Sequence, residues 1–194
     1  MSCHPKSRLV CIFLAKTHDS RLFAYWRSRS TQDSDPPISH LRTPISHLPM
    51  HHISIRTADI HRSIAFYECL GFTISERFTT GYTLACWMEG LGGRIELIQI
   101  PEPKPAPDAF NDEHYVGYYH LSFDLTDLSV DLTSWLADFS TRLQSIELSA
   151  PKILLAPSQQ IIGTQVYEVA FLNDPDSLPL ELIRRCSQPA IASL

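Results

Sequence analysis

The chain has 194 residues, of which 44% are hydrophobic and 19% are charged, as in a soluble globular domain with a packed core. The formal net charge of −5 argues against nucleic acid as the main partner, because proteins that bind nucleic acid usually carry a basic surface. The five cysteines lack paired spacing and no apolar run reaches the roughly 20 residues of a membrane span, so we expect reduced thiols, a cytoplasmic protein and no membrane partner.

Residues 1–49 differ in composition from the rest of the chain. Up to Thr31 they contain six basic residues and a single acid, Asp19. An Arg- and Ser-rich leader with few acids is typical of a transit peptide, which would mean organellar import. The interpretation that we favour is a disordered extension, or translated upstream sequence with Met50 as the natural start. No functional residue is predicted there, and residues 188–194 are predicted to be a tail.

Residues 51–100 predict a β-α-β-β-β module. Residues 52–57 alternate between polar and apolar side chains, as a half-buried strand does. A helix is predicted next, with Asp59 as its N-cap and Gly71 at its end. Three β-rich runs, separated by glycine-containing turns, complete the module and cover residues 72–78, 82–88 and 94–100.

Residues 116–186 predict a second module of the same order, after a proline-rich linker over residues 101–114. An amphipathic helix is predicted to begin after Asp127. Strands are predicted over residues 118–125, 152–155, 165–172 and 178–183, with a loop at 156–163. We therefore predict an α+β domain over residues 50–187, in which two paired βαβββ modules form a cup-shaped mixed sheet with helices on the outer face.

Four polar residues recur at equivalent places in the two modules. The run His52-Ile-Ser-Ile matches His120-Leu-Ser-Phe, and Ile-Glu96-Leu-Ile matches Leu-Glu181-Leu-Ile. Strand alternation points these His and Glu side chains away from their apolar neighbours, onto the face opposite the helices. Two imidazoles and two carboxylates around one divalent ion leave open positions for water or substrate, as in catalytic metal sites. The sequence therefore predicts a metal site made of these four residues.

Each of these residues taken alone has a more common interpretation as a surface residue. Their recurrence in a duplicated unit favours the ligand interpretation. His51 competes with His52, but position 52 matches His120 in the repeat. His61 is predicted to be an exposed helix residue and His114 a linker residue.

The residues above carry a family resemblance. Phe66-Tyr67 followed by Leu-Gly71-Phe resembles the opening of the vicinal oxygen chelate proteins, the glyoxalase I superfamily, and Asp174-Pro-Asp176 resembles the approach to that family's closing strand. The resemblance spans about residues 51–186. It implies paired modules that form a metal-holding cup. The His/Glu/His/Glu set is similar to that of bacterial glyoxalase I, whereas dioxygenases of the family usually show His/His/Glu.

The resemblance implies a metal-dependent lyase or isomerase, similar to lactoylglutathione lyase, that acts on the hemithioacetal of methylglyoxal and glutathione. It implies one divalent ion per site, namely nickel, cobalt or zinc, or iron in a dioxygenase. Glu181 would be the base that moves a proton through an enediolate, with Glu96 as its counterpart. Arg56 would contact glutathione, although an exposed edge Arg is an equally good interpretation. Because paired modules in this superfamily often form sites at a dimer interface, a homodimer is expected.

Three departures from the glyoxalase pattern put glutathione in doubt as the cosubstrate. The expected Asn four residues after the first ligand Glu is Ile100, the residues before His120 read Tyr-Val-Gly-Tyr-Tyr, and residues 156–163 lack the usual basic side chains. An epimerase, an iron-dependent oxygenase or a non-catalytic protein that binds a small ligand in the same cup are the alternatives. The sequence leaves open whether the cup closes within one chain or between two.

Overall fold

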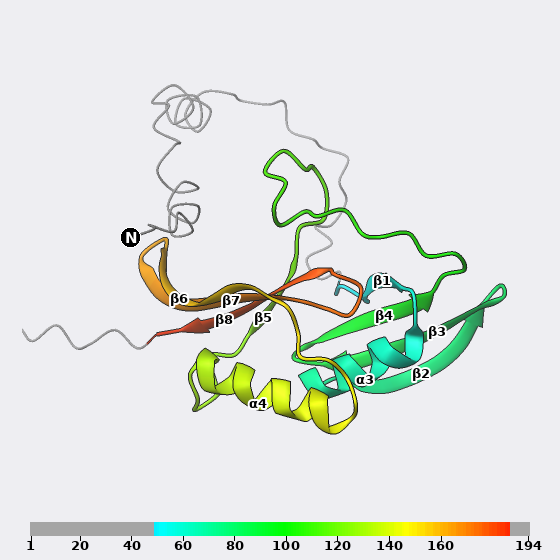
Figure 1. Cartoon of the computed structure of the whole chain (residues 1–194), viewed down its shortest axis with the longest axis horizontal. Coiled ribbons are helices and arrows are strands. Elements are labelled where there is room, and N and C mark those ends of the chain that lie inside the picture. Colours follow the sequence, from blue (N-terminus) through cyan, green and yellow to red (C-terminus); the bar gives the residue numbers. More distant parts are fainter. Residues whose placement is uncertain (1–48, 187–194) are drawn as a thin grey trace, which may run out of the picture. The chain divides into compact units, whose positions relative to one another are not determined.

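The computed structural model describes residues 49–186, which form two helices and eight strands within the unit Met50–Leu194 (Figure 1). The predictions for residues 1–49 and 188–194 lie outside the described residues, apart from Pro49. The eight strands make two four-stranded mixed sheets, which confirms the α+β class and the two βαβββ modules. Within residues 49–186 there is no helix with the length and hydropathy of a membrane span.

The first module contains β1 (Ile53–Thr57), α3 (Ile60–Leu70), β2 (Thr73–Thr80), β3 (Thr83–Gly90) and β4 (Gly93–Gln99). Its strands have the order β1-β4-β3-β2, with β1 parallel to β4 and the other pairs antiparallel. As predicted, Asp59 caps α3 by accepting hydrogen bonds from two backbone N–H groups, and Gly71 ends the helix in the left-handed region at φ 118°.

The second module contains β5 (Leu121–Asp124), α4 (Leu132–Ser145), β6 (Ile153–Ile162), β7 (Gln165–Asn173) and β8 (Pro179–Arg185). Its strands have the equivalent order β5-β8-β7-β6, with β5 parallel to β8. The predicted start of its helix after Asp127 is wrong. Asp131 is the N-cap and accepts from the backbone N–H of Ser134 at 2.8 Å, because the residues before it form a turn in which Leu128 is exposed.

The predicted loop at residues 156–163 is also wrong, because most of it belongs to β6 and pairs with β7. Pro157 lies where the pairing register shifts between Leu155 and Ser158. A bulge at this position spares the ladder a hydrogen bond that proline cannot donate. The proline therefore marks an irregularity in a long edge strand and not a loop.

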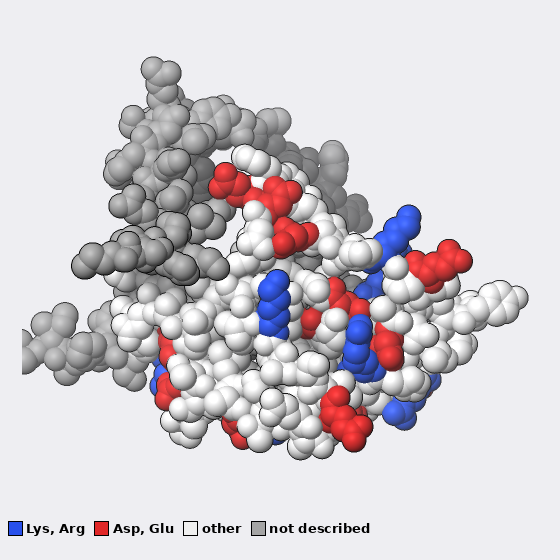
Figure 2. All heavy atoms as spheres, in the orientation of Figure 1, with Lys and Arg blue, Asp and Glu red and all other residues white. Residues whose placement is uncertain are grey.

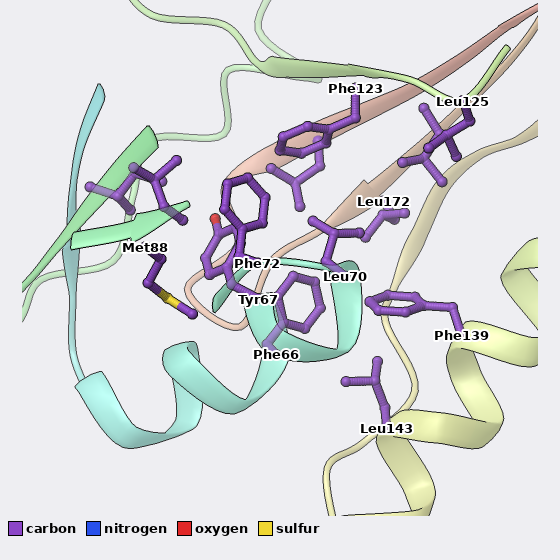
Figure 3. Close-up of a cluster of buried hydrophobic side chains, with 14 of the residues drawn as sticks. Phe66, Tyr67, Leu70, Phe72, Met88, Phe123, Leu125, Phe139, Leu143 and Leu172 are labelled. Carbon is purple, nitrogen blue, oxygen red and sulfur yellow. The ribbon is translucent and has the colours of Figure 1, made fainter. Parts of the chain in front are cut away.

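Both modules share one hydrophobic core, to which α3, α4 and one face of each sheet contribute (Figure 3). Phe66 on α3 packs edge-on against Phe139 on α4, with ring centroids 5.4 Å apart. Phe72 of the first module meets Phe123 of the second at 5.8 Å. Because side chains alternate along a strand, the other face of each sheet turns away from this core. We call these two outward faces the ligand faces, because they carry the predicted His and Glu residues.

The turn between β7 and β8 joins the modules through buried polar contacts. The carboxylate of Asp176 accepts from Thr57 Oγ1 and from Arg62 Nη2, both at 2.6 Å. Asp174 is 5% exposed and accepts from the hydroxyl of Tyr67 at 3.1 Å. Its burial raises the pKa of Asp174 to about 6, although backbone N–H donors in the turn oppose the rise. The second module is thus anchored to the start of α3 in the first.

Candidate metal centre

The first predicted pair, His52 and Glu96, lies where β1 meets β4. His52 immediately precedes β1, and Glu96 lies within β4, in register with Ser54. Nε2 of His52 is 3.4 Å from Oε2 of Glu96, and both side chains are partly buried. Two hydrogen-bonded parallel strands therefore set the separation of the two side chains.

Neighbouring side chains hold the outer atoms of this pair. Nδ1 of His52 lies 2.7 Å from Nδ1 of His51, and Nε2 of His51 lies 2.9 Å from the guanidinium of Arg94. Trp87, the β3 residue in register with Glu96, donates its indole N–H to Oε1 of Glu96 at 3.1 Å. A partner for the second ring nitrogen is the usual arrangement of a metal-binding His, since it fixes the orientation of the ring.

The second predicted pair, His120 and Glu181, repeats the geometry of the first. His120 immediately precedes β5, and Glu181 lies in β8, in register with Ser122. Nε2 of His120 is 3.4 Å from Oε2 of Glu181. Hydrogen bonds from His120 and Ser122 lower the pKa of Glu181, against the opposing effect of partial burial. The carboxylate is therefore ionised at neutral pH.

The surroundings of the second pair differ from those of the first. Nδ1 of His120 is buried and has no hydrogen-bond partner within residues 49–186. Its ring is instead enclosed by aromatic rings, with the centroid of Tyr119 at 4.6 Å and that of Phe171 at 5.1 Å, both edge-on. Ring packing thus holds the His120 side chain, whereas hydrogen bonds hold the side chains of the first pair.

The structure brings the four predicted ligands together as two pairs. In the part of the chain from 49 to 186, no three His, Cys, Asp or Glu side chains are grouped so as to hold one ion. The physical reason is the shared core, because each pair stands on a ligand face that turns away from it.

The two atoms of each pair nevertheless fit a divalent ion. Bonds of about 2.1 Å from a nitrogen and an oxygen 3.4 Å apart would meet at close to the tetrahedral angle. Imidazole and carboxylate donors suit nickel, cobalt, zinc and iron. Each pair supplies two ligands, whereas catalytic zinc sites use three from the protein. Each pair therefore has the donor set of half a site.

The other residues singled out in the sequence are placed as follows. Arg56 is exposed on the ligand face of β1, and no side-chain partner is found for it within residues 49–186. Its contact with glutathione remains a prediction. His61 and His114 are exposed, as expected.

Three residues around the pairs escaped the sequence interpretation. Trp87 would follow from the strand register, because it is the cross-strand neighbour of Glu96. His51 was weighed as a rival of His52 and is instead its hydrogen-bond partner. The only feature of the sequence that indicates a role for Tyr119 is its position immediately before His120.

Charged side chains of both signs are interspersed over the face of the described residues shown in Figure 2. Blue and red side chains touch on the right side of that face, and no broad basic area is visible there within residues 49–186.

Comparison with known proteins gives consistent matches. The model of the Glyoxalase/Bleomycin resistance protein/Dioxygenase superfamily matches residues 50–140. The uncharacterized protein YaeR of Escherichia coli (strain K12) is 32% identical over 137 residues, which cover 69% of this chain and 93% of that protein.

Two solved structures show the same fold. A glyoxalase family protein from Bacillus cereus superposes with a TM-score of 0.53 at 17% identity, over 73% of this chain and 96% of that one. A mutant glyoxalase I from Zea mays gives 0.50 at 20% identity, over 71% of this chain and 45% of that one. At these identities the likeness extends to the fold alone.

Proposed function

Because this chain belongs to the Glyoxalase/Bleomycin resistance protein/Dioxygenase superfamily, we propose that it is a metal-dependent, glyoxalase I-like lyase that works as a homodimer. One observation carries the proposal. The same His–Glu pair, with the same 3.4 Å separation, stands at the equivalent place in both modules. A surface His has no reason to recur together with its carboxylate neighbour in both halves of a duplicated fold.

The positions of the two pairs support a homodimer. In a two-fold symmetric dimer, the first pair of one chain faces the second pair of its partner, so that each of two sites receives four ligands. The strands that follow the ligand His residues, β1 and β5, are both at the edge of their sheets. Edge strands carry unpaired backbone groups that another chain can join. Closure between chains therefore needs no rearrangement of the shared core.

The proposed substrate is a small adduct of a 2-oxoaldehyde and a thiol, with glutathione as the first candidate thiol. His52, Glu96, His120 and Glu181 would hold the divalent ion (nickel, cobalt or zinc), with Glu181 as the ligand that detaches to act as a base. When bound, the ion supplies Lewis-acid stabilisation of negative charge on the substrate oxygens. Arg56 is available on the ligand face to bind a carboxylate of the thiol.

Glu181 moves the proton in the proposed reaction. It removes the proton from the carbon beside the carbonyl and returns it to the adjacent carbon, through an enediolate of the substrate. Hydrogen bonds from His120 and Ser122 lower the pKa of Glu181, which keeps it ionised but makes it a weak base. Turnover therefore requires Glu181 to give up at least one of these hydrogen bonds when the substrate binds.

Two measurements on one preparation test the proposal. The full chain is purified without chelator, its metal content is determined by elemental analysis, and it is assayed with methylglyoxal plus glutathione. We expect a bound divalent ion and turnover that is lost in Glu181→Gln. Glu68→Gln makes the same chemical change on the exposed side of α3 and is expected to be fully active.

Other outcomes separate the alternatives. Full turnover in Glu181→Gln would exclude it as the base. Oxygen consumption with ferrous iron, without lyase activity, would identify a dioxygenase of the same superfamily. Absence of bound metal together with small-ligand binding would identify a non-catalytic member.

A further inference from the structure

A small group of aromatic side chains lies beside the second pair and outside the hydrophobic core. Phe171 is only 8% exposed, yet it is not part of the core cluster shared by the two modules. It stands on β7 in register with Glu181, and therefore on the ligand face of the second sheet. Two aromatic residues from the segment that leads into β5 pack against Phe171.

These two residues are Phe110 and Tyr119. The ring centroid of Phe110 lies 5.3 Å from that of Phe171, and that of Tyr119 lies 6.2 Å from it. The rings of Phe110 and Tyr119 are inclined by only 21° to each other. We call Phe110, Tyr119 and Phe171 the aromatic wall. The ring of His120 meets the wall edge-on, so the wall directly borders the predicted ligand.

The wall keeps an open side. Tyr119 is 42% exposed, so its packing against its neighbours leaves much of the side chain uncovered. The Arg side chains that stack on rings in residues 49–186 lie over Trp87, Trp135 and Phe139, away from the wall. The exposed part of Tyr119 is thus an aromatic surface next to the second pair.

We propose that the aromatic wall is a subsite for a planar aryl group, so that this site prefers aryl-substituted 2-oxo compounds to methyl-substituted ones. The preferred reaction follows from the proposed function, but the binding preference can be measured without any turnover. An aryl group gains ring-to-ring contact and buried area against such a wall, whereas a methyl group is too small to reach across it. Tyr119 is the determinant to change, because it is the exposed member of the wall.

The test uses two probes that differ only at this group. Phenylglyoxylate and pyruvate both offer neighbouring keto and carboxylate oxygens, but one carries phenyl where the other carries methyl. Binding of each to the full-length, metal-loaded protein is measured by isothermal titration calorimetry. We expect phenylglyoxylate to bind at least about tenfold more tightly than pyruvate. In Tyr119→Ala that preference should fall to about twofold or less.

A matched control lies one residue away. Tyr118 is 62% exposed and has no described ring contact with the wall, so Tyr118→Ala should keep the full preference. Unchanged pyruvate affinity in Tyr119→Ala shows that the variant has an intact metal centre. If that variant fails to fold, Phe110→Leu removes a second ring of the wall and should also lower the preference.

Two sets of outcomes separate this inference from the proposed function. Equal affinities in the wild type, binding of neither probe, or a preference that survives both substitutions would overturn the subsite. Loss of the preference in Tyr119→Ala supports it, whether or not methylglyoxal and glutathione are turned over. Turnover without any aryl preference would leave the lyase proposal standing and the subsite refuted.

Discussion

The two modules hold the same His–Glu pair in different surroundings. In the first, His51 and Trp87 hydrogen-bond the outer atoms of His52 and Glu96. In the second, Nδ1 of His120 has no partner among the described residues, and aromatic rings border the pair. Strand register thus sets the spacing of both pairs, while neighbouring side chains differentiate them. Under the proposed function, this difference would make the first pair the more firmly held metal ligands and the second the pair that also meets the substrate.

The largest effect is expected when the carboxylates of the two pairs are replaced. Glu181→Gln should lower kcat by about a thousandfold, because a proton acceptor is lost. Glu96→Gln should mainly weaken metal binding, because a neutral amide oxygen binds a divalent ion less tightly than the carboxylate that Trp87 holds in place. Steady-state kinetics at saturating metal separates the two effects. Equal losses of kcat in the two variants would contradict the assignment of different roles.

The second prediction concerns the turns that close the two modules. The β3–β4 turn is rich in glycine, whereas the β7–β8 turn carries Asp176, which accepts hydrogen bonds from Thr57 and Arg62. Asp176→Ala leaves these partners unpaired and should lower the free energy of unfolding by about 3 kcal/mol. Urea unfolding measures the loss. Asp138→Ala removes an exposed ion pair on α4 and should cost less than about 0.5 kcal/mol.

The other acid of the same turn gives a pH dependence. Asp174 has a pKa of about 6 in the fold, raised from 3.8 by burial, so its contribution to stability is complete below pH 3.8 and is lost as the pH rises through 6. The loss amounts to about 3 kcal/mol at most. In Asp174→Asn this part of the decline should vanish. Urea unfolding at several pH values between 4 and 7.5 measures it, and parallel profiles for the two proteins would refute the assignment.

The smallest effect is expected when the hydrogen-bond partner of the His52 imidazole is removed. His51→Ala removes the hydrogen-bond partner of His52 and should weaken metal binding about tenfold, as loss of an outer partner of a metal-binding His typically does. Competition with a chromophoric chelator measures the affinity. His61→Ala removes an exposed imidazole from α3 and serves as the control. An unchanged affinity in His51→Ala would mean that His52 needs no such support.

Much of the fold follows from local chemistry that the sequence displays. Alternation over residues 52–57, the cap at Asp59 and the left-handed end at Gly71 are each set by a few neighbouring residues. The helix of the second module was predicted to start four residues early, because Asp127 and Asp131 are both chemically suited to cap it and only the fold selects between them. The loop predicted at residues 156–163 failed for a similar reason, since Pro157 is accommodated by a bulge.

Part of the candidate site could likewise be predicted from the sequence, and part depends on how the modules pack. The equivalence of His52 with His120, and of Glu96 with Glu181, was visible because a duplicated unit repeats its pattern. Strand alternation also gave the face on which each residue lies. Strand alternation does not predict how the ligand faces of the two sheets are oriented relative to each other. That orientation depends on how both modules pack around one core. Contacts such as that of Asp176 with Arg62 join residues too far apart in the chain to leave a local signal.

Complementation between two defective chains tests the central claim most directly. His52→Ala and His120→Ala chains are co-expressed with different tags, the heterodimer is purified on both tags, and its metal content is measured. Each variant alone should bind no tightly held ion. The heterodimer should hold about half the metal of the wild-type dimer, because one of its two sites combines the intact pair of each chain. A heterodimer without metal, or single variants that bind metal fully, would contradict a site shared between two chains.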